Sequence, residues 1–179
     1  MTVANELLAD GFDRVRETVH EVVSGLDEDR LGFRPHDHGN SIGWLVWHLT
    51  RIQDDHIAAL AGVEQAWPRW RDSFKLPFRP NATGYGQSSK DVGAVRVDGD
   101  LLGQYHSDVH DLTMRYLATV TDDELARIVD TRWDPPVTAS MRLVSVIGDT
   151  LQHLGQAAYV RGLAERANRA WRTPSAADR

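Results

Sequence analysis

The hydrophobic pattern of this sequence is clearest near its end, where residues 141–163 have the composition of a buried helix. Few helix breakers interrupt this stretch, and apolar or small residues lie around nearly the whole circumference of the predicted helix, so we expect it to be largely buried. Asp149 and His153 stand inside it, one turn apart. Four residues of helix turn the side-chain direction by only about 40°, so both side chains are expected on one face.

Three other stretches have the period of amphipathic or apolar helices. Apolar side chains recur in them at intervals of three and four residues. These stretches are residues 2–23, 41–60 and 100–120. Together with the helix at 141–163 they predict an all-α fold, a four-helix bundle. One domain is expected over residues 1–165, followed by a charged tail, residues 166–179, that frays from the last helix.

The second and third helices are joined by a long segment, residues 66–99, that loses helical periodicity and gains proline and glycine. A loop rich in aromatic, glycine and proline residues is therefore expected here. Ordered loops of this length are uncommon in a compact domain and are usually functional. The aromatic side chains favour packing against the bundle, where the loop would wall a pocket, but a surface excursion also fits. Before the fourth helix, residues 128–137 have room for only a short β-excursion.

Composition narrows the classes of function. The chain has 179 residues, of which 41% are hydrophobic, enough for one sizeable core. The formal charge of -6 argues against a nucleic-acid partner. No stretch resembles a signal peptide or approaches the ~18 apolar residues of a membrane span, so no membrane partner and a cytoplasmic location are expected. The chain has no cysteine, so any thiol chemistry needs a thiol supplied by the substrate.

Three residues in two helices are candidates for a metal site. His48 interrupts the apolar pattern of the second helix as Asp149 and His153 interrupt that of the fourth. If the two helices pack side by side, these side chains meet, and a buried carboxylate is costly unless it is paired or bound to a metal. Two imidazoles and one carboxylate suit zinc, nickel or ferrous iron. Each histidine taken alone is more typical of a hydrogen-bonded core or interface residue.

A second pair of histidines competes with this site. His106 and His110 form an HxxxH pair on the third helix, near the polar side of its apolar stripe, so we expect both to be mostly solvated, although His106 could line the cavity. Asp55, two turns after His48, could orient a ligand histidine. His56 is expected to pack within the bundle or at an interface.

With four helices placed, the layout resembles the DinB-like metalloprotein superfamily. In that superfamily a four-helix bundle holds a divalent metal through a histidine on the second helix and an HxxxH pair on the fourth. His48 in WLVWHLT matches the first ligand and His153 in DTLQH the last, while Asp149 stands where the pair has its first histidine. Aspartate binds zinc through oxygen at normal distances, so this departure changes the ligand set without abolishing the site.

Four segments resemble more closely the actinobacterial branch that contains mycothiol-dependent S-transferases. They are NSIGWLVWHLTRIQDDH, TGYGQSS, RWDPPVT and RLVSVIGDTLQHLGQAAYVRGL. The resemblance implies a homodimer with a divalent metal, zinc before nickel or iron, and mycothiol as the co-substrate. The mycothiol thiolate would attack an electrophilic small molecule, a detoxification reaction. The same bundle also serves bacillithiol transferases, a mycothiol-dependent maleylpyruvate isomerase and members with no assigned reaction.

Other roles rest on single residues. Trp44, Trp47 and Tyr159 could wall a substrate pocket, and Arg161 could hold a sugar or carboxylate group of the thiol. The aromatic residues fit the core equally well, and Arg161 fits a surface ion pair. Two other functions stay open: a metal-dependent hydrolase or isomerase that uses bound water, and a non-catalytic metal-binding stress protein. No catalytic side chain is assigned besides the candidate ligands.

Overall fold

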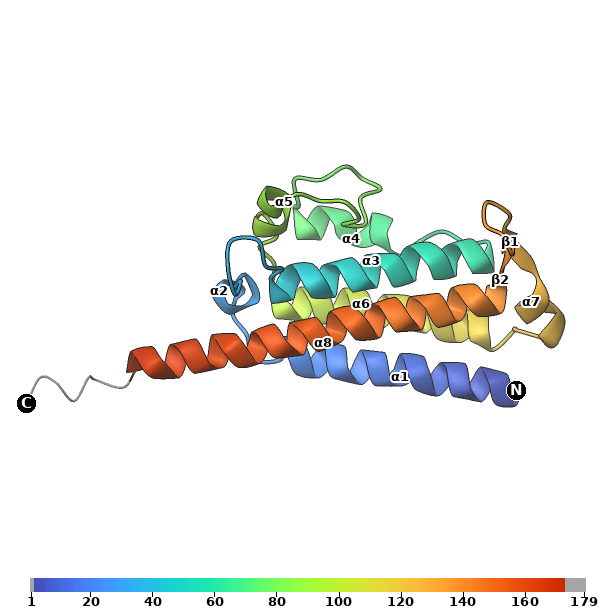
Figure 1. The fold of residues 1–179 in the computed structure, drawn as a ribbon, viewed down its shortest axis with the longest axis horizontal. Helices are drawn as coiled ribbons and strands as arrows, with labels where there is room; N and C mark the ends of the chain where they lie inside the picture. Colours follow the sequence, from blue (N-terminus) through green and yellow to red (C-terminus); the bar gives the residue numbers. More distant parts are fainter. Residues whose placement is uncertain (1, 173–179) are drawn as a thin grey trace, which may run out of the picture.

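The computed structural model describes residues 2–172, and it describes the side chains of residues 2–167. Four long helices pack side by side (Figure 1), and the predicted all-α four-helix bundle is confirmed. They are α1 (Val3–Val23), α3 (Ile42–Ala61), α6 (Gly99–Leu117) and α8 (Ala139–Arg172). α8 packs against α3 and α1, and α6 also contacts both of these helices. The expected tail is helical up to Arg172, and its last part, residues 173–179, lies outside the described residues.

Short elements connect the long helices. α2 (Glu28–Leu31) lies between α1 and α3, and α7 (Asp122–Ala126) follows α6. Strands β1 (Ile128–Asp130) and β2 (Val137–Thr138) then form an antiparallel hairpin directly before α8, as the extended pattern there predicts. Among the described residues, no helix is both long enough and apolar enough to cross a membrane.

Capping side chains set where three of the long helices begin. The hydroxyl of Thr2 starts α1, that of Ser41 starts α3, and the carboxylate of Asp98 starts α6, each by accepting a hydrogen bond from a backbone N–H of the first turn. α3 ends at Gly62, whose φ of 66° lies in the left-handed region that favours glycine. The helix boundaries therefore follow from local chemistry that is visible in the sequence.

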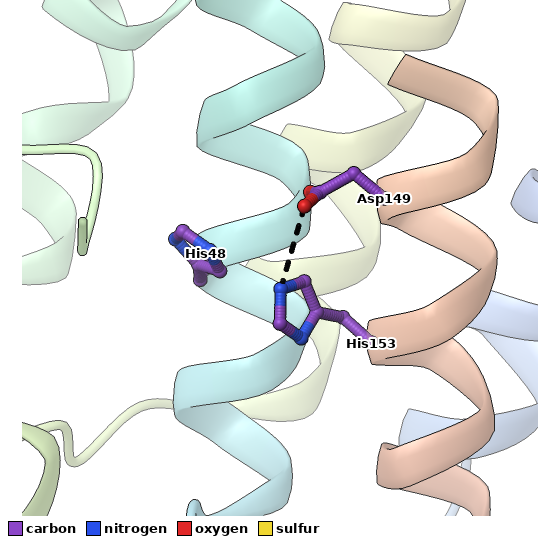
Figure 2. Close-up of side chains that lie close together, drawn as sticks. All are labelled: His48, Asp149 and His153. Atoms are coloured by element: carbon purple, nitrogen blue, oxygen red, sulfur yellow. Dashed lines mark ion pairs between the residues drawn. The ribbon is translucent and has the colours of Figure 1, made fainter. Parts of the chain in front are cut away.

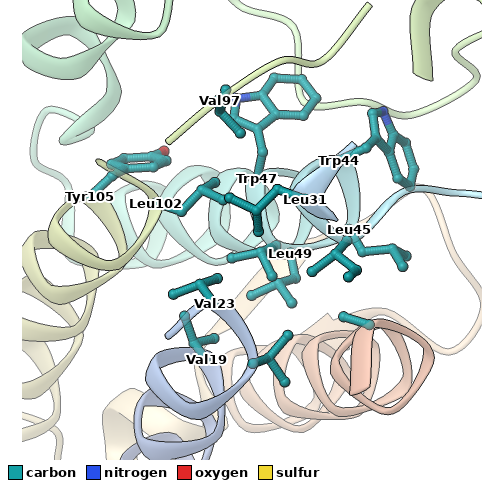
Figure 3. Close-up of a cluster of buried hydrophobic side chains, with 14 of the residues drawn as sticks. Val19, Val23, Leu31, Trp44, Leu45, Trp47, Leu49, Val97, Leu102 and Tyr105 are labelled. Atoms are coloured by element: carbon teal, nitrogen blue, oxygen red, sulfur yellow. The ribbon is translucent and has the colours of Figure 1, made fainter. Parts of the chain in front are cut away.

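Two hydrophobic clusters form the core, one towards each end of the bundle. Figure 3 shows part of the first, in which α1, α3 and α6 contribute Val19, Val23, Leu45, Leu49 and Leu102. The second draws buried side chains from all four long helices, among them Phe12, Ile57, Leu117 and Leu143. Both clusters hold α3 and α8 side by side, and this contact positions the candidate metal ligands.

α8 is buried along one stripe only. The buried positions recur every three or four residues: Leu143, Val146, Thr150, Leu154 and Ala157. Four large apolar side chains on the other face are exposed: Met141 (48%), Val144 (64%), Leu151 (47%) and Tyr159 (65%). The prediction that residues 141–163 are largely buried is therefore wrong for a single chain. Among the described residues, the long helices against which α8 mainly packs are α1 and α3, and these apolar side chains lie outside that contact.

The long connection between α3 and α6 contains helix, unlike the loop that was expected. α4 (Trp67–Phe74) and α5 (Ser89–Gly93) lie within it. Pro68 suggested a break, but it occupies the first turn of α4, where the missing N–H has no helical partner in any case. The prediction that this segment packs against the bundle is confirmed, because Trp67, Phe74 and Val92 are buried in the first cluster.

A buried ion pair holds this connection on α3. Arg51 and Asp54 are both fully buried, and Arg51 Nη1 donates to Asp54 Oδ2 at 3.2 Å. Asp54 also accepts hydrogen bonds from the backbone N–H groups of Ala66 and Trp67, both at 2.8 Å, and from the Tyr105 hydroxyl at 2.9 Å. No capping side chain of α4 itself binds the free N–H groups at its start. The Asp54 carboxylate of α3 accepts their hydrogen bonds instead.

Arg51 extends the same network along the connection. Its Nε donates to the backbone carbonyl of Ala82 at 3.1 Å, and its guanidinium lies over the Trp67 ring, 5.1 Å from the ring centroid. One arginine therefore fixes the connection near its start, at Trp67, and near its middle, at Ala82. The residue after Ala82 is Thr83, which contacts the candidate metal centre.

The histidine pair of α6 is buried, so the expectation that it is mostly solvated is wrong. His106 is 0% and His110 3% exposed. The Thr50 hydroxyl already donates to a backbone carbonyl, so it accepts a hydrogen bond from His106 Nδ1 at 3.2 Å. His110 Nε2 lies 3.1 Å from Asp13 Oδ1. The two histidines thus lie against α3 and α1, neighbours that the pattern of α6 alone does not reveal.

Replacing Asp54 with Asn is expected to destabilise the fold by roughly 3–5 kcal/mol, because it leaves the Arg51 guanidinium buried without its charge partner. Urea unfolding followed by tryptophan fluorescence measures this loss. Asp55→Asn is the matched control, since its carboxylate is 44% exposed and lies on the same helix. Equal loss in the two variants would show that the buried pair does not anchor the connection.

Stability is expected to fall in mild acid because of His106. Burial, helped by His110, His20 and Arg16, lowers the pKa of His106 from 6.5 to about 3. Below pH 6.5 the unfolded chain therefore binds a proton at this histidine that the folded chain does not bind. The free energy of unfolding is expected to fall by about 1.4 kcal/mol between about pH 7.5 and about pH 5.5 for this reason. His106→Asn keeps a donor towards Thr50 and cannot titrate. Urea unfolding at the two pH values should show a smaller acid loss in this variant, and an unchanged loss would contradict the assignment.

Candidate metal centre

The packing of α3 against α8 brings three side chains together. Figure 2 shows His48 of α3 facing Asp149 and His153 of α8. Each offers one possible ligand atom, and these atoms all lie within 4.8 Å of one another. His153 Nε2 is 3.6 Å from Asp149 Oδ1, and the two imidazole centroids are 4.8 Å apart. Among the described residues, this is the one group of three or more such side chains that could hold a metal ion.

The backbone of the long connection fixes the tautomer of His48. His48 Nδ1 lies 2.6 Å from the carbonyl oxygen of Thr83, which can only accept, so Nδ1 carries the proton. Nε2 is then left with a free lone pair, as a metal ligand requires. Burial lowers the pKa of His48, although the hydrogen bond to Thr83 opposes this shift. The imidazole is therefore held neutral and correctly oriented at neutral pH.

Aromatic and glycine contacts hold the His48 ring in place. Trp44 stacks on it with 4.7 Å between ring centroids, and its indole N–H donates to Gln87 Oε1 at 2.7 Å. The edge of Trp44 also faces His153 at 6.4 Å. On another side, Gly84 has a φ of +98°, and a Cβ there would lie only 2.6 Å from His48 Nδ1. A glycine is therefore needed where the connection meets this ring.

The three residues fit a divalent metal ion. Asp149 Oδ2 is buried and has no hydrogen-bond partner, a costly arrangement that a bound cation would satisfy. Bond lengths of ~2.0–2.2 Å to nitrogen and oxygen let one ion span ligand atoms about 4 Å apart, so small side-chain rotations suffice. The Asp149 side chain is 40% and the His153 side chain 20% exposed, so the cluster is open to solvent on one side. A small molecule can approach from there.

Of the residues considered for substrate binding, Trp44 alone contacts the cluster. Trp47 is fully buried and packs against Trp67 and Phe78 of the long connection. It packs against the connection between α3 and α6 and does not line the open side of the cluster.

Tyr159 and Arg161 lie away from the cluster. Tyr159 follows His153 by six residues, which turns its direction by about 120° on a helix. Arg161 donates hydrogen bonds to the backbone carbonyls at the end of α1, those of Glu21, Val22 and Ser24. Arg161 therefore caps α1, a structural role that the sequence pattern did not reveal.

The remaining candidates are also separate from the cluster. Asp55 accepts a hydrogen bond from Gln65 at 2.7 Å, so it does not orient His48 as expected. His56 is half-buried beside the hairpin and lines a cavity of about 510 Å³ with Arg142. His106 faces Thr50 between the helices and takes no part in the group of three.

Sequence reasoning missed the residues that hold His48. Thr83, Gly84 and Gln87 all come from the segment TGYGQSS, which was singled out only for its resemblance. Two glycines that flank one tyrosine are a local signal for left-handed backbone, and Gly84 and Gly86 both have positive φ. That signal does not say which helix the turn meets, because the contact depends on the anchoring of the whole connection.

Comparisons with known proteins agree with this geometry. The family model described as Mycothiol-S-transferase matches residues 7–165. A crystal structure of a conserved protein from Enterococcus faecalis superposes with a TM-score of 0.85 and 30% sequence identity, covering 92% of this chain and 98% of that one. A comparison with curated proteins finds none that matches. Since the family model spans the bundle and all three candidate ligands, the chain belongs to the mycothiol S-transferase family of DinB-like proteins.

Proposed function

We propose that this protein is a metal-dependent S-transferase that conjugates mycothiol to electrophilic small molecules, a detoxification reaction. The observation that carries the proposal is the convergence of His48, Asp149 and His153 with an unpartnered carboxylate oxygen, in a chain of this family. The chain has no cysteine, so the nucleophilic sulfur must belong to a bound thiol.

Zinc is the proposed ion, because two imidazoles and one carboxylate leave a coordination position for substrate; nickel or iron would accept the same donors. A divalent ion bound here would lower the pKa of a thiol and so supply thiolate at neutral pH. Asp149 contributes a negative charge that a third histidine would not, which leaves more electron density on the sulfur. The Thr83 carbonyl keeps His48 in the tautomer that the site requires.

Trp44 is the proposed wall for the reacting groups, because its ring lies against both candidate imidazoles. Trp47, Tyr159 and Arg161 have no proposed part in substrate binding, because Trp47 is fully buried, Arg161 binds the end of α1, and Tyr159 is more than one turn of α8 beyond His153. The proposed location is the cytoplasm, where small thiols are kept reduced, and the proposed assembly is a homodimer.

The metal content of ligand variants tests the centre. His153→Ala and Asp149→Asn are each expected to weaken metal binding at least about tenfold, because each removes a ligand. Asp149→His restores a third donor and should retain metal. His56→Ala, two turns further along α3 from His48, is the matched control. Elemental analysis of dialysed protein prepared without a histidine tag measures the ratio of metal to chain, and an unchanged ratio in His153→Ala would show that the site is misplaced.

Thiol dependence tests the reaction. Protein loaded with zinc should convert an electrophilic fluorogenic bimane to its mycothiol conjugate, and chelation of the metal should abolish the enzymatic rate until zinc is restored. Mass spectrometry of the product identifies the new carbon–sulfur bond. Turnover of the probe by water alone would favour a metal-dependent hydrolase. Full metal occupancy with no turnover of any thiol would favour a non-catalytic metal-binding protein.

A further inference from the structure

The cavity of about 510 Å³ that His56 and Arg142 line has a polar wall. It lies where the β1–β2 hairpin meets the end of α3 and the start of α8, and Figure 1 shows the hairpin beside these two helix ends. We call it the hairpin cavity. Most of its side chains are polar or charged, and three of them are arginines: Arg127, Arg132 and Arg142. Cavities with convergent polar groups are the usual sites for small molecules.

Two of these arginines share one carboxylate. Asp130 is 8% exposed and accepts hydrogen bonds from Arg132 Nε and Nη2 at 3.0 and 2.8 Å. It also accepts one from Arg142 Nη2 at 3.2 Å. A single negative charge cannot neutralise two guanidinium groups, so one positive charge is left in excess around Asp130.

The other charges of the hairpin cavity do not remove this excess. Arg127 has a partner of its own, because it donates to both carboxylate oxygens of Glu124. The carboxylate of Asp55 is 44% exposed and accepts a hydrogen bond from Gln65, so water screens its charge. In the described part of the chain, no ion pair joins Asp55 to Arg142.

Arg142 has hydrogen-bond donors that no group of the described chain uses. Its side chain is 21% exposed, and its hydrogen bond to Asp130 involves Nη2 alone. Within residues 2–167, no acceptor is found for its Nε or its Nη1. A guanidinium presents its N–H groups in a planar fork that matches a carboxylate. A largely buried arginine in this state therefore favours a bound anion.

The hairpin cavity and the metal centre lie along the same two helices. On α8, Arg142, Ser145 and Asp149 follow one another at intervals of three and four residues, so their side chains share one face. The seven residues from Arg142 to Asp149 cover about 10 Å at 1.5 Å per residue. On α3, His48 belongs to the metal centre and His56, two turns later, lines the cavity.

No fully buried side chain closes the space between the two places. Ser145 of α8 is exposed, and Ile52 of α3 is only partly buried. The electrostatics also connect them. Burial lowers the pKa of His56 and Arg142 lowers it further, whereas Asp149 raises it. His56 therefore lies within electrostatic reach of both the cavity and the metal centre, and one small molecule can extend from one to the other.

We infer that Arg142 binds a carboxylate of the electrophilic substrate in the hairpin cavity, while the reacting carbon of that substrate lies at the metal centre. This inference rests on the proposed function and names its substrate class. The class is that of acidic electrophiles whose carboxylate is roughly 10 Å from the reacting carbon. An uncharged analogue leaves the guanidinium without its anion, and a site built for a polar partner rejects such an analogue strongly.

Two matched electrophiles test this preference: 4′-(bromomethyl)biphenyl-4-carboxylate and its carboxamide. With either one, the mycothiol thiolate attacks the benzylic carbon, a carbon–sulfur bond forms, and bromide leaves with the electron pair of the carbon–bromine bond. After subtraction of the spontaneous rate, the zinc-loaded protein is expected to show a KM about tenfold lower for the carboxylate, at similar kcat. Equal KM values would overturn the inference and leave the proposed transferase standing.

Variants of the hairpin cavity assign the preference to Arg142. Arg142→Gln is expected to raise the KM for the carboxylate about tenfold and to leave the KM for the carboxamide nearly unchanged. Arg14→Gln is the matched control, because it removes an arginine of α1 that is 71% exposed. Since Arg142→Gln also breaks the ion pair with Asp130, Ala59→Glu is a second variant. It adds a negative charge at an exposed position of the cavity and keeps that pair, so it should also raise the KM for the carboxylate.

Binding without turnover separates this site from the proposed reaction. Fluorine NMR measures the dissociation constant of the unreactive 4′-(trifluoromethyl)biphenyl-4-carboxylate for the zinc-loaded protein. The wild type is expected to bind it about tenfold more tightly than Arg142→Gln does, and both proteins hold the same zinc. This result with no turnover of any thiol would refute the proposed function alone. Equal dissociation constants for the wild type, Arg142→Gln and Ala59→Glu would refute the inference.

Discussion

The buried pair of Arg51 and Asp54 is the constraint on which the arrangement of the site depends. Two charges without exposure to water are tolerable only when their remaining hydrogen bonds are made, and these partners lie in the long connection. The backbone of Ala66 and that of Ala82 are bound to the same pair, so the connection has little freedom to shift on α3. Thr83 and Gly84 are thereby held against His48.

The candidate metal centre therefore has two kinds of support. Regular helices determine how far apart the three ligand side chains lie, since α3 and α8 are locked by the core on both sides of them. The irregular connection determines the protonation of His48 through the Thr83 carbonyl and limits the position of its ring through Gly84, while Trp44 of α3 stacks on that ring. Metal chemistry needs both, because a ligand must be correctly placed and must also present a free lone pair.

α8 carries different side chains on its two sides. Asp149 and His153 lie on its side towards α3, whereas the exposed apolar residues lie on its outward side. The apolar composition of α8 therefore exceeds what its contacts with α1 and α3 bury.

The sequence by itself determined the four long helices, the short hairpin and the three candidate ligands, because periodicity, caps and interrupted apolar runs are local features. Only the tertiary structure decided that His106 is buried where it meets Thr50 of α3, that His110 is buried where it meets Asp13 of α1, that Arg161 caps α1, and that Thr83 holds His48. Each of these depends on which helix or loop lies opposite a given face. A pattern along one helix reports how polar that face is, but the neighbour that satisfies it comes from a distant part of the chain.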